Sequence, residues 1–130
     1  MKQLESEQDL AEMLSAGYAA LFLFVDWSDY ARRGREVFQA AATNFAARSS
    51  DRSVSWWIFD LSSISSPVSE VLHRWLALQT RRTEIRVFPN IATGNGSVVW
   101  IKDGQIVGFE ANAQLSGHDA LAHRTEKVFS

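Results

Sequence analysis

The chain has 130 residues, of which 46% are hydrophobic and 22% are charged, and its formal net charge is −2 at pH 7. This composition is typical of one soluble globular domain and excludes disordered and collagen-like chains. The sequence contains no cysteine, which excludes disulfide bonds, thiolate nucleophiles and every dithiol redox reaction. The 13 basic and 15 acidic side chains nearly balance, so no positive excess is present to bind nucleic acid or an anionic membrane.

The sequence shows no segment that would place the protein in or across a membrane. Its longest apolar run, residues 18–25, is much shorter than the roughly 20 residues that a membrane helix needs. Residues 1–9 carry more acidic than basic side chains, whereas a secretory signal begins with basic residues. We therefore expect a cytoplasmic protein.

The first half of the chain predicts a helix, a strand and a second helix. Ser6 and Asp9 have the spacing of a helix capping box, which predicts a helix over residues 6–16. Residues 19–25 form a continuous apolar run that is typical of a strand covered on both faces. Apolar side chains then recur at helical spacing over residues 30–48, which predicts an amphipathic helix.

The middle of the chain predicts a further strand and helix. Residues 54–61 form a second apolar run like the first, which predicts another doubly covered strand. Helical spacing continues from Pro67 to about Gln79, with Ser66 as the expected N-cap. Residues 80–95 show no clear pattern.

The last third of the chain predicts a β-hairpin and a final helix. The dipeptide at residues 103–104 is Asp-Gly, a strong hairpin turn signal, and it separates two apolar strands at 97–101 and 105–109. A last helix is expected over residues 116–128. No repeat or flexible linker divides the chain, so residues 1–130 are expected to form a single domain.

The order of these elements predicts the fold class. A strand–helix–strand unit requires a right-handed crossover and a parallel strand pair, and the hairpin adds antiparallel strands to the same sheet. We therefore predict an α/β fold in which a central mixed β-sheet is flanked by helices on both faces.

The passage from the first strand into the second helix has a distinctive sequence, Trp27-Ser28-Asp29-Tyr30-Ala31-Arg32. Together with the order of elements and the hairpin, it resembles the thioredoxin family over nearly the whole chain. In that family the stretch reads Trp-Cys-x-x-Cys followed by a basic residue, so Ser28 and Ala31 occupy the two cysteine positions. The resemblance implies a thioredoxin-like fold without its dithiol chemistry.

The family also places a cis-proline just before the hairpin, where it faces the active site and a bound peptide. The register set by the hairpin assigns Gly96 to this position, whereas a competing register assigns Pro89. We favour Gly96 because its hairpin match is longer. In either register the segment 81–95 is longer than the family's connection.

Few side chains suggest catalysis. Ser28 lies at the expected N-terminus of the second helix, but a serine nucleophile needs a base, so we favour a helix N-cap. Asp26 and Asp29 are interpreted as turn and cap residues rather than as an acid–base pair. His118 and His123 lie five residues apart, so on a helix their rings diverge by about 140° and make a poor metal pair. We predict no catalytic residue, no metal and no cofactor.

Other side chains suggest binding. The resemblance places Trp27 and Tyr30 at an exposed tip, and exposed aromatic residues are enriched where proteins bind each other. The other tryptophans are expected to pack in the core: Trp56, Trp57, Trp75 and Trp100. Two arginine clusters would contact an acidic partner together only if the fold brings them close. They are Arg32, Arg33 and Arg35, and Arg81, Arg82 and Arg86.

The leading hypothesis is a redox-inactive protein of the thioredoxin fold that acts as an adaptor-like or chaperone-like interaction module. Its binding site, which we call the tip, comprises Trp27, Ser28, Asp29, Tyr30, Ala31, Arg32, Gly96 and Ser97. We expect a protein partner, no nucleic acid or membrane partner, and a monomer or weak homodimer.

Two alternatives remain open. The first is a non-thiol enzyme or a small-molecule site, similar to glutathione-binding domains, in which the hydroxyl group of Ser28 or Tyr30 would stabilise a bound thiolate. The second is a self-assembling module, because the last strand of the hairpin would lie at a sheet edge and open edges pair.

Overall fold

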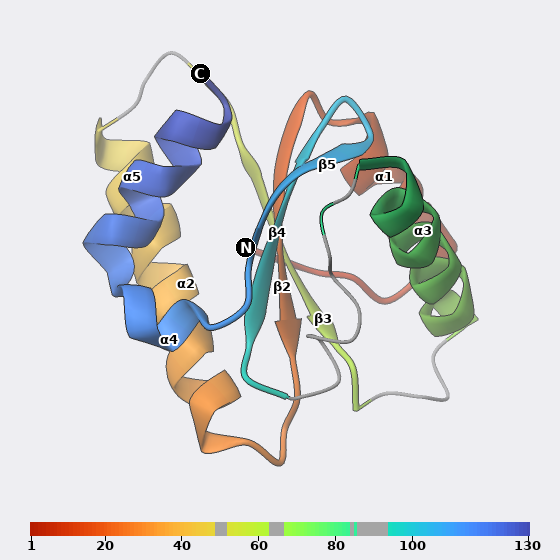
Figure 1. Cartoon of the computed structure of the whole chain (residues 1–130), viewed down its shortest axis with the longest axis horizontal. Coiled ribbons are helices and arrows are strands. Elements are labelled where there is room, and N and C mark those ends of the chain that lie inside the picture. The colour runs from red at the N-terminus through yellow and green to blue at the C-terminus, as the bar shows by residue number, and fades with distance from the viewer. Residues whose placement is uncertain (49–51, 63–66, 84, 86–93) are drawn as a thin grey trace.

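The computed structural model describes residues 1–48, 52–62, 67–83, 85 and 94–130 (Figure 1). The strands are β1 (Lys2–Gln3), β2 (Tyr18–Phe24), β3 (Ser55–Asp60), β4 (Ser97–Lys102) and β5 (Gln105–Glu110). The helices are α1 (Glu7–Ser15), α2 (Asp29–Arg48), α3 (Pro67–Thr83), α4 (Ala113–Ser116) and α5 (His118–Val128).

The strands form one mixed sheet in the order β1-β3-β2-β4-β5. The β2–α2–β3 unit makes a parallel pair, while β4 runs antiparallel to β2 and β5 antiparallel to β4. The predicted mixed sheet is therefore confirmed. The sequence pattern did not reveal β1, because a strand of two residues has no periodic signal. Its pairing of Lys2 with Trp57 covers part of β3, which would otherwise lie at the edge.

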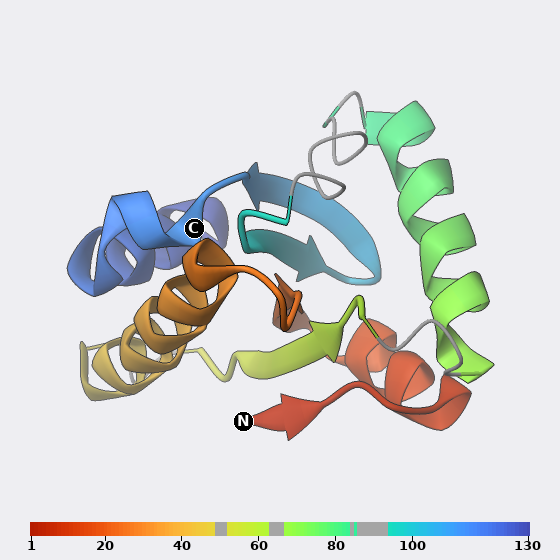
Figure 2. The same cartoon turned by 90° about the horizontal axis from the view of Figure 1, so that it is seen from below.

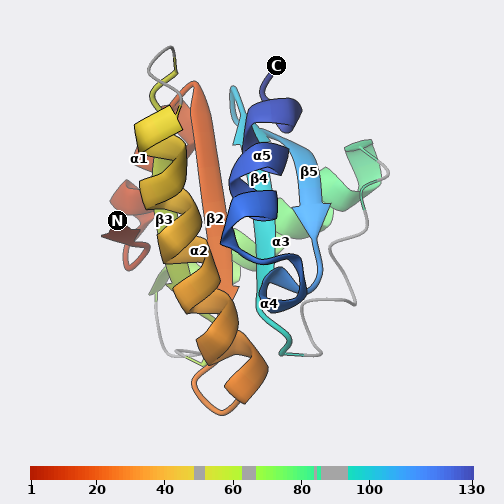
Figure 3. The ribbon, with the colours of Figure 1, turned by 90° about the vertical axis from the view of Figure 1, so that its left-hand side faces the viewer.

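Helices cover both faces of the sheet. Seen from below, α1 and α3 lie on one side, and α2, α4 and α5 lie on the other (Figure 2). The side view shows α2 and α5 next to each other, with α4 beside the N-terminal half of α2 (Figure 3). Side chains of β2 alternate between two cores, with Leu21 and Leu23 facing α1 and α3, and Phe22 facing α2. This double covering explains the continuous apolar run in β2.

Two local predictions are confirmed, one for the start of the first helix and one for the hairpin turn. The backbone N–H of Asp9 donates to Ser6 Oγ at 3.1 Å, and the N–H of Ser6 donates to the Asp9 carboxylate at 3.1 Å, which completes the capping box. In the hairpin, Asp103 and Gly104 have φ values of 51° and 79°. Two positive φ values identify a turn whose twist matches the flanking strands, which is why the Asp-Gly pair predicts it.

The last helix differs from the prediction. The helix expected over 116–128 begins at His118, because Gly117 adopts φ 78°, outside the helical region, and the short helix α4 that precedes this glycine was not predicted. The third helix continues to Thr83, beyond the predicted end at Gln79. The proposed cap Ser66 lies outside the described residues.

Candidate functional site

The tip lies where β2 ends and α2 begins, and Ser28 caps that helix. The Ser28 hydroxyl accepts the backbone N–H of Ala31 at 3.3 Å, and the Ser28 carbonyl accepts the N–H of Arg32 at 3.1 Å. The residue is only 7% exposed. The hydroxyl is therefore engaged by the helix, as predicted for an N-cap.

Gly96 lies at the junction of β4 with α2 and α4. A Cβ atom on Gly96 would meet the Cα of Ala31 at 3.0 Å and the Phe22 ring at 2.9 Å. The Gly96 carbonyl also accepts the N–H of Ala113, the first residue of α4, at 3.0 Å. Gly96 thus lies against Ala31, the residue that the resemblance assigns to the second cysteine position. Gly96 has a φ of 82°, which proline cannot adopt because its ring holds φ near −65°. Pro89 lies outside the described residues.

Trp27 rests on the loop that precedes β4. A Cβ atom on Gly94 would meet the Trp27 indole at 2.4 Å, so this close approach requires glycine, and Gly94 has φ 69°. The far end of the indole ring lies against Gly94, but most of the residue remains in solvent, since Trp27 is 66% exposed. Tyr30 is 53% exposed beside it. A depression of about 360 Å³ is lined by Trp27, Ser28, Asp29, Tyr30 and Arg33.

The charged side chains of the tip have different partners. Arg32 forms an ion pair with Asp29 and donates to the backbone carbonyl of Asp26. The Asp26 carboxylate instead accepts the hydroxyl of Ser62 at 3.0 Å. The two aspartates therefore serve the turn and the helix start rather than facing each other. Arg33 lines the depression and has no ion-pair partner among the described residues.

The structure divides the residues of the expected binding site into two groups. Ser28, Ala31, Gly96 and Ser97 are buried and shape the tip from within. The Ser97 hydroxyl, for example, donates to the backbone carbonyl of Ala111 at 3.0 Å. Trp27, Asp29, Tyr30 and Arg32 are exposed. Within the tip, only this second group and the neighbouring exposed residue Arg33 can contact a partner directly with their side chains.

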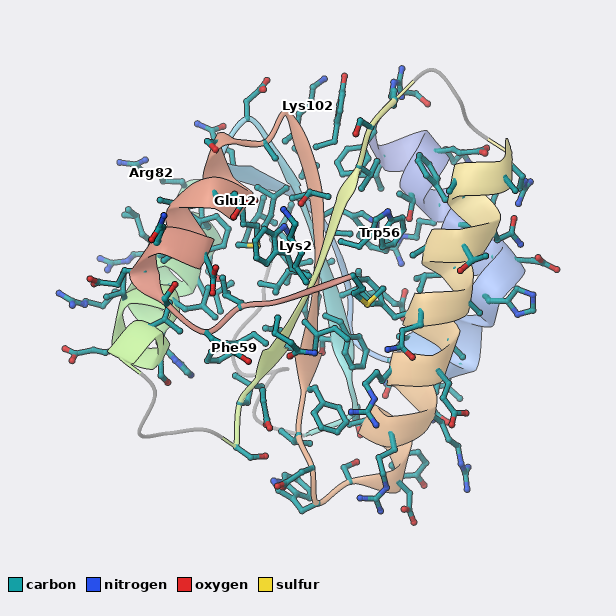
Figure 4. The ribbon with its side chains drawn as sticks, turned by 180° about the vertical axis from the view of Figure 1, so that it is seen from behind. Lys2, Glu12, Trp56, Phe59, Arg82 and Lys102 are labelled. Atoms are coloured by element: carbon teal, nitrogen blue, oxygen red, sulfur yellow. The ribbon has the colours of Figure 1, made fainter. Side chains whose placement is uncertain are left out.

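The two arginine clusters do not meet. Arg82 lies at the end of α3, across the sheet from α2 (Figure 4). Arg35 in the first cluster lies over the Phe24 ring, with 4.4 Å between the guanidinium carbon and the ring centroid. Arg86 lies outside the described residues. A joint basic surface is therefore not formed by the described members of the clusters.

The histidines and the helices of the described part of the chain bear on metal and membrane binding. His118 and His123 are both exposed on α5, as expected for surface histidines. Within the described ranges, no group of three or more histidine, cysteine or acidic side chains could hold a metal ion. No helix among these same residues is both long enough and apolar enough to cross a membrane.

Two side chains form hydrogen bonds with backbone groups of β5, the edge strand through which the self-assembly alternative would operate. Gln79, 3% exposed, accepts the backbone N–H of Ile106 at 3.2 Å. Arg124 donates to the carbonyl of Phe109 at 2.8 Å and forms an ion pair with Glu110. Neither residue was predicted to have a role at the sheet edge. The sequence does contain a feature that could have indicated the role of Gln79: it is a polar residue on the apolar face of its helix, three residues after Leu76.

Comparisons with known proteins identify the fold. No protein-family model matches the chain, and no curated protein matches its sequence. Solved structures do match: a thioredoxin from Malassezia sympodialis has a TM-score of 0.62 and 13% identity, with 100% of this chain and 91% of that chain covered. A thioredoxin from Plasmodium falciparum has a TM-score of 0.61 and 16% identity, with 98% of each chain covered.

A third match is part of a larger protein. Human ERp44 in its zinc-bound form has a TM-score of 0.64 and 15% identity, and the alignment covers 100% of this chain but 32% of ERp44. At these identities the matches show the fold alone. The five-stranded mixed sheet and the helices on both of its faces agree with them. The chain therefore has a thioredoxin-like fold and contains no cysteine.

Proposed function

We propose that this chain is a protein-interaction module, adaptor-like or chaperone-like, that binds its partner through the tip. The observation that carries the proposal is the pair of aromatic side chains at the start of α2, with Trp27 66% exposed and Tyr30 53% exposed. Tyrosine and tryptophan dominate the energetically important contacts of protein interfaces because they bury large apolar areas and retain a polar group.

The tip is held in place before any partner arrives. Ser28 caps the helix, and the Trp27 ring lies against Gly94. Gly96 fits against Ala31, which leaves no room for the loop to move closer. A preorganised surface loses less conformational entropy when it binds, so more of the contact energy appears as affinity.

The charge at the depression favours a partner of particular chemistry. Arg33 lines it and has no ion-pair partner among the residues that the structure describes. An apolar side chain of the partner would lie against Trp27 and Tyr30, and a neighbouring carboxylate would pair with Arg33. We infer a protein partner with a mixed apolar and acidic contact surface.

The proposal extends to the catalytic status, location and oligomeric state of the protein. Without a cysteine, the chain has no thiol with which to exchange electrons. Binding through the tip does not need one. We propose a non-enzymatic role in the cytoplasm, as a monomer or weak homodimer, without nucleic acid or membrane partners.

Affinity capture with the tagged chain tests the proposal. The wild-type chain is compared with a double variant, Trp27→Ala with Tyr30→Ala, which removes the exposed aromatic pair without changing the charge of the tip, and captured proteins are identified by mass spectrometry. Leu78→Ala is the matched control, because Leu78 is also an exposed apolar residue, at 40%, but lies on α3 across the sheet. Circular dichroism checks that each variant is folded.

We expect a partner that the wild type and Leu78→Ala capture equally and that the double variant loses. The proposal is contradicted if the folded double variant recovers the same proteins in the same amounts as the wild type.

A further inference from the structure

A second hollow lies against the C-terminal half of α2, away from the tip. It has a volume of about 380 Å³ and is lined by Ala42, Phe45, Ala46, Arg52, Ser53, Val54 and Trp56. Ala42 lies 13 residues beyond Asp29, the first residue of α2. At 1.5 Å per residue this is about 20 Å along the helix axis. The hollow is therefore separate from the tip, and its volume lies within the range of small-molecule sites, roughly 300–1,000 Å³.

Aromatic side chains form the apolar wall of the hollow. The prediction placed Trp56 in the core, but it is only partly buried, whereas Trp57 is 1% exposed. The Trp56 ring meets Phe38 and Phe45 edge-on, with centroid distances of 5.2 and 5.8 Å. It lies between the sheet and α2 (Figure 4). Packing with these rings holds the indole in place while part of it borders the open space.

Small side chains on α2 create that space. Ala42 and Ala46 are one helical turn apart and therefore share a face of the helix. Each contributes only a methyl group opposite Val54 and Trp56. A larger side chain at either position would fill the volume that a ligand would occupy.

A positively charged side chain, Arg52, also lines the hollow. The guanidinium carbon of Arg52 is 5.6 Å from the centroid of the Tyr18 ring, and the Lys102 ammonium is 5.8 Å from the same centroid. Neither cation has an ion pair with another described residue. By contrast, Arg48 at the end of α2 is 4.0 Å from Glu126. This end of the molecule thus presents cationic groups without matching carboxylates beside an apolar hollow.

We propose that this hollow binds a small amphipathic organic anion. Its apolar body, an aromatic ring or short hydrocarbon chain, lies against Phe45, Val54 and Trp56. Its anionic group, a carboxylate, sulfonate or phosphate, pairs with Arg52, which can form two parallel charge-assisted hydrogen bonds to such a group. The site does not depend on the proposed role of the tip.

Paired fluorescent probes test the two halves of the site separately. Anilinonaphthalene sulfonate carries both an aromatic body and an anionic group, while phenylnaphthylamine has a closely similar body without the sulfonate. We expect the sulfonate probe to bind the wild-type chain saturably at one site. Arg52→Gln is expected to weaken the sulfonate probe by roughly tenfold, equivalent to losing one charge-assisted contact, and to leave the neutral probe unchanged. Ala46→Leu is expected to weaken both probes, because the leucine fills the hollow.

Two matched controls locate the binding. Arg48→Gln removes the same charge from the same end of the molecule without altering the lining of the hollow, so it should bind both probes like the wild type. The tip variant, Trp27→Ala with Tyr30→Ala, should also bind normally. Thermal unfolding shows that every variant compared is folded.

The proposal is overturned by any of three results. These are sulfonate binding that does not saturate, a folded Arg52→Gln variant with wild-type affinity for the sulfonate probe, or a folded Ala46→Leu variant that binds both probes normally. Loss of probe binding in the tip variant alone would assign the probe to the tip and likewise reject the hollow.

Discussion

A buried hydrogen bond between β4 and α5 offers a quantitative test of the structure. The Trp100 indole N–H donates to Thr125 Oγ1 at 2.9 Å, and the Thr125 hydroxyl in turn donates to the carbonyl of Leu121 at 2.8 Å. Trp100 and Thr125 are both 0% exposed. Replacing Thr125→Val keeps the shape of the side chain but removes the acceptor, which leaves the indole N–H without a partner and out of reach of water.

The cost of this change follows from the burial. An orphaned buried donor costs about 1–3 kcal/mol, so we expect Thr125→Val to lower the free energy of unfolding by about 2 kcal/mol. Thr125→Ser keeps the hydroxyl and loses one methyl group, which costs about 0.8 kcal/mol in lost burial. For a chain of this length, 2 kcal/mol corresponds to a fall in Tm of about 7 °C.

Urea denaturation followed by far-UV circular dichroism measures these differences. The midpoint should fall in the order wild type, Thr125→Ser, Thr125→Val, with an unchanged dependence on urea concentration, since the surface exposed on unfolding stays the same. If Thr125→Val proves as stable as the wild type, or more stable than Thr125→Ser, the indole N–H does not depend on this hydroxyl and the reasoning is wrong.

Three further predictions concern the edge strand, the α2 cap and the first helix. Gln79→Leu leaves the buried N–H of Ile106 without its acceptor and should destabilise the fold by about 1–3 kcal/mol; faster hydrogen exchange at the Ile106 amide checks the cause, and unchanged exchange contradicts it. Ser28→Ala removes the cap of α2 and should cost about 1 kcal/mol in urea denaturation, whereas Ser130→Ala, in which the altered hydroxyl lies at the exposed C-terminus, should cost nothing measurable. The backbone N–H of Glu5, followed by the hydrogen bonds with Ser6, holds the pKa of Asp9 below its ordinary value. Because the folded pKa is the lower one, this contribution to stability is complete above the ordinary value and is lost as the pH falls through the folded value; an NMR titration of Asp9 should show the low pKa, and Asp9→Asn should remove this part of the acid dependence.

Much of the fold was predictable because its signals are local. The capping box of Ser6 and Asp9 and the Asp-Gly turn of the hairpin depend on residues close together in the chain. The apolar run of β2 predicts burial on both faces whatever covers them. The absence of cysteine excludes dithiol chemistry in any fold. Conversely, Gly117 delays the start of the last helix to His118 because it takes a backbone conformation that the sequence permits but does not require.

The candidate sites depended more heavily on tertiary structure. Sequence analysis identified the tip from its resemblance, but only the packed chain shows that Ser97 is buried while Tyr30 is exposed. The hollow brings Ala42 of α2 beside Arg52 and Trp56, which follow it by 10 and 14 residues in the chain.

The absence of cysteine, the α/β element order and the individual helix and turn signals were determined by the sequence itself. The pairing of β1 with β3, the contact of Gly96 with Ala31 and the bond from Ile106 to Gln79 were decided only by the tertiary structure. The physical reason is the distance along the chain between the residues that interact. Helix caps and turns form between neighbours a few residues apart, whereas contacts across the sheet depend on strand order and register, which the packing of the whole chain sets.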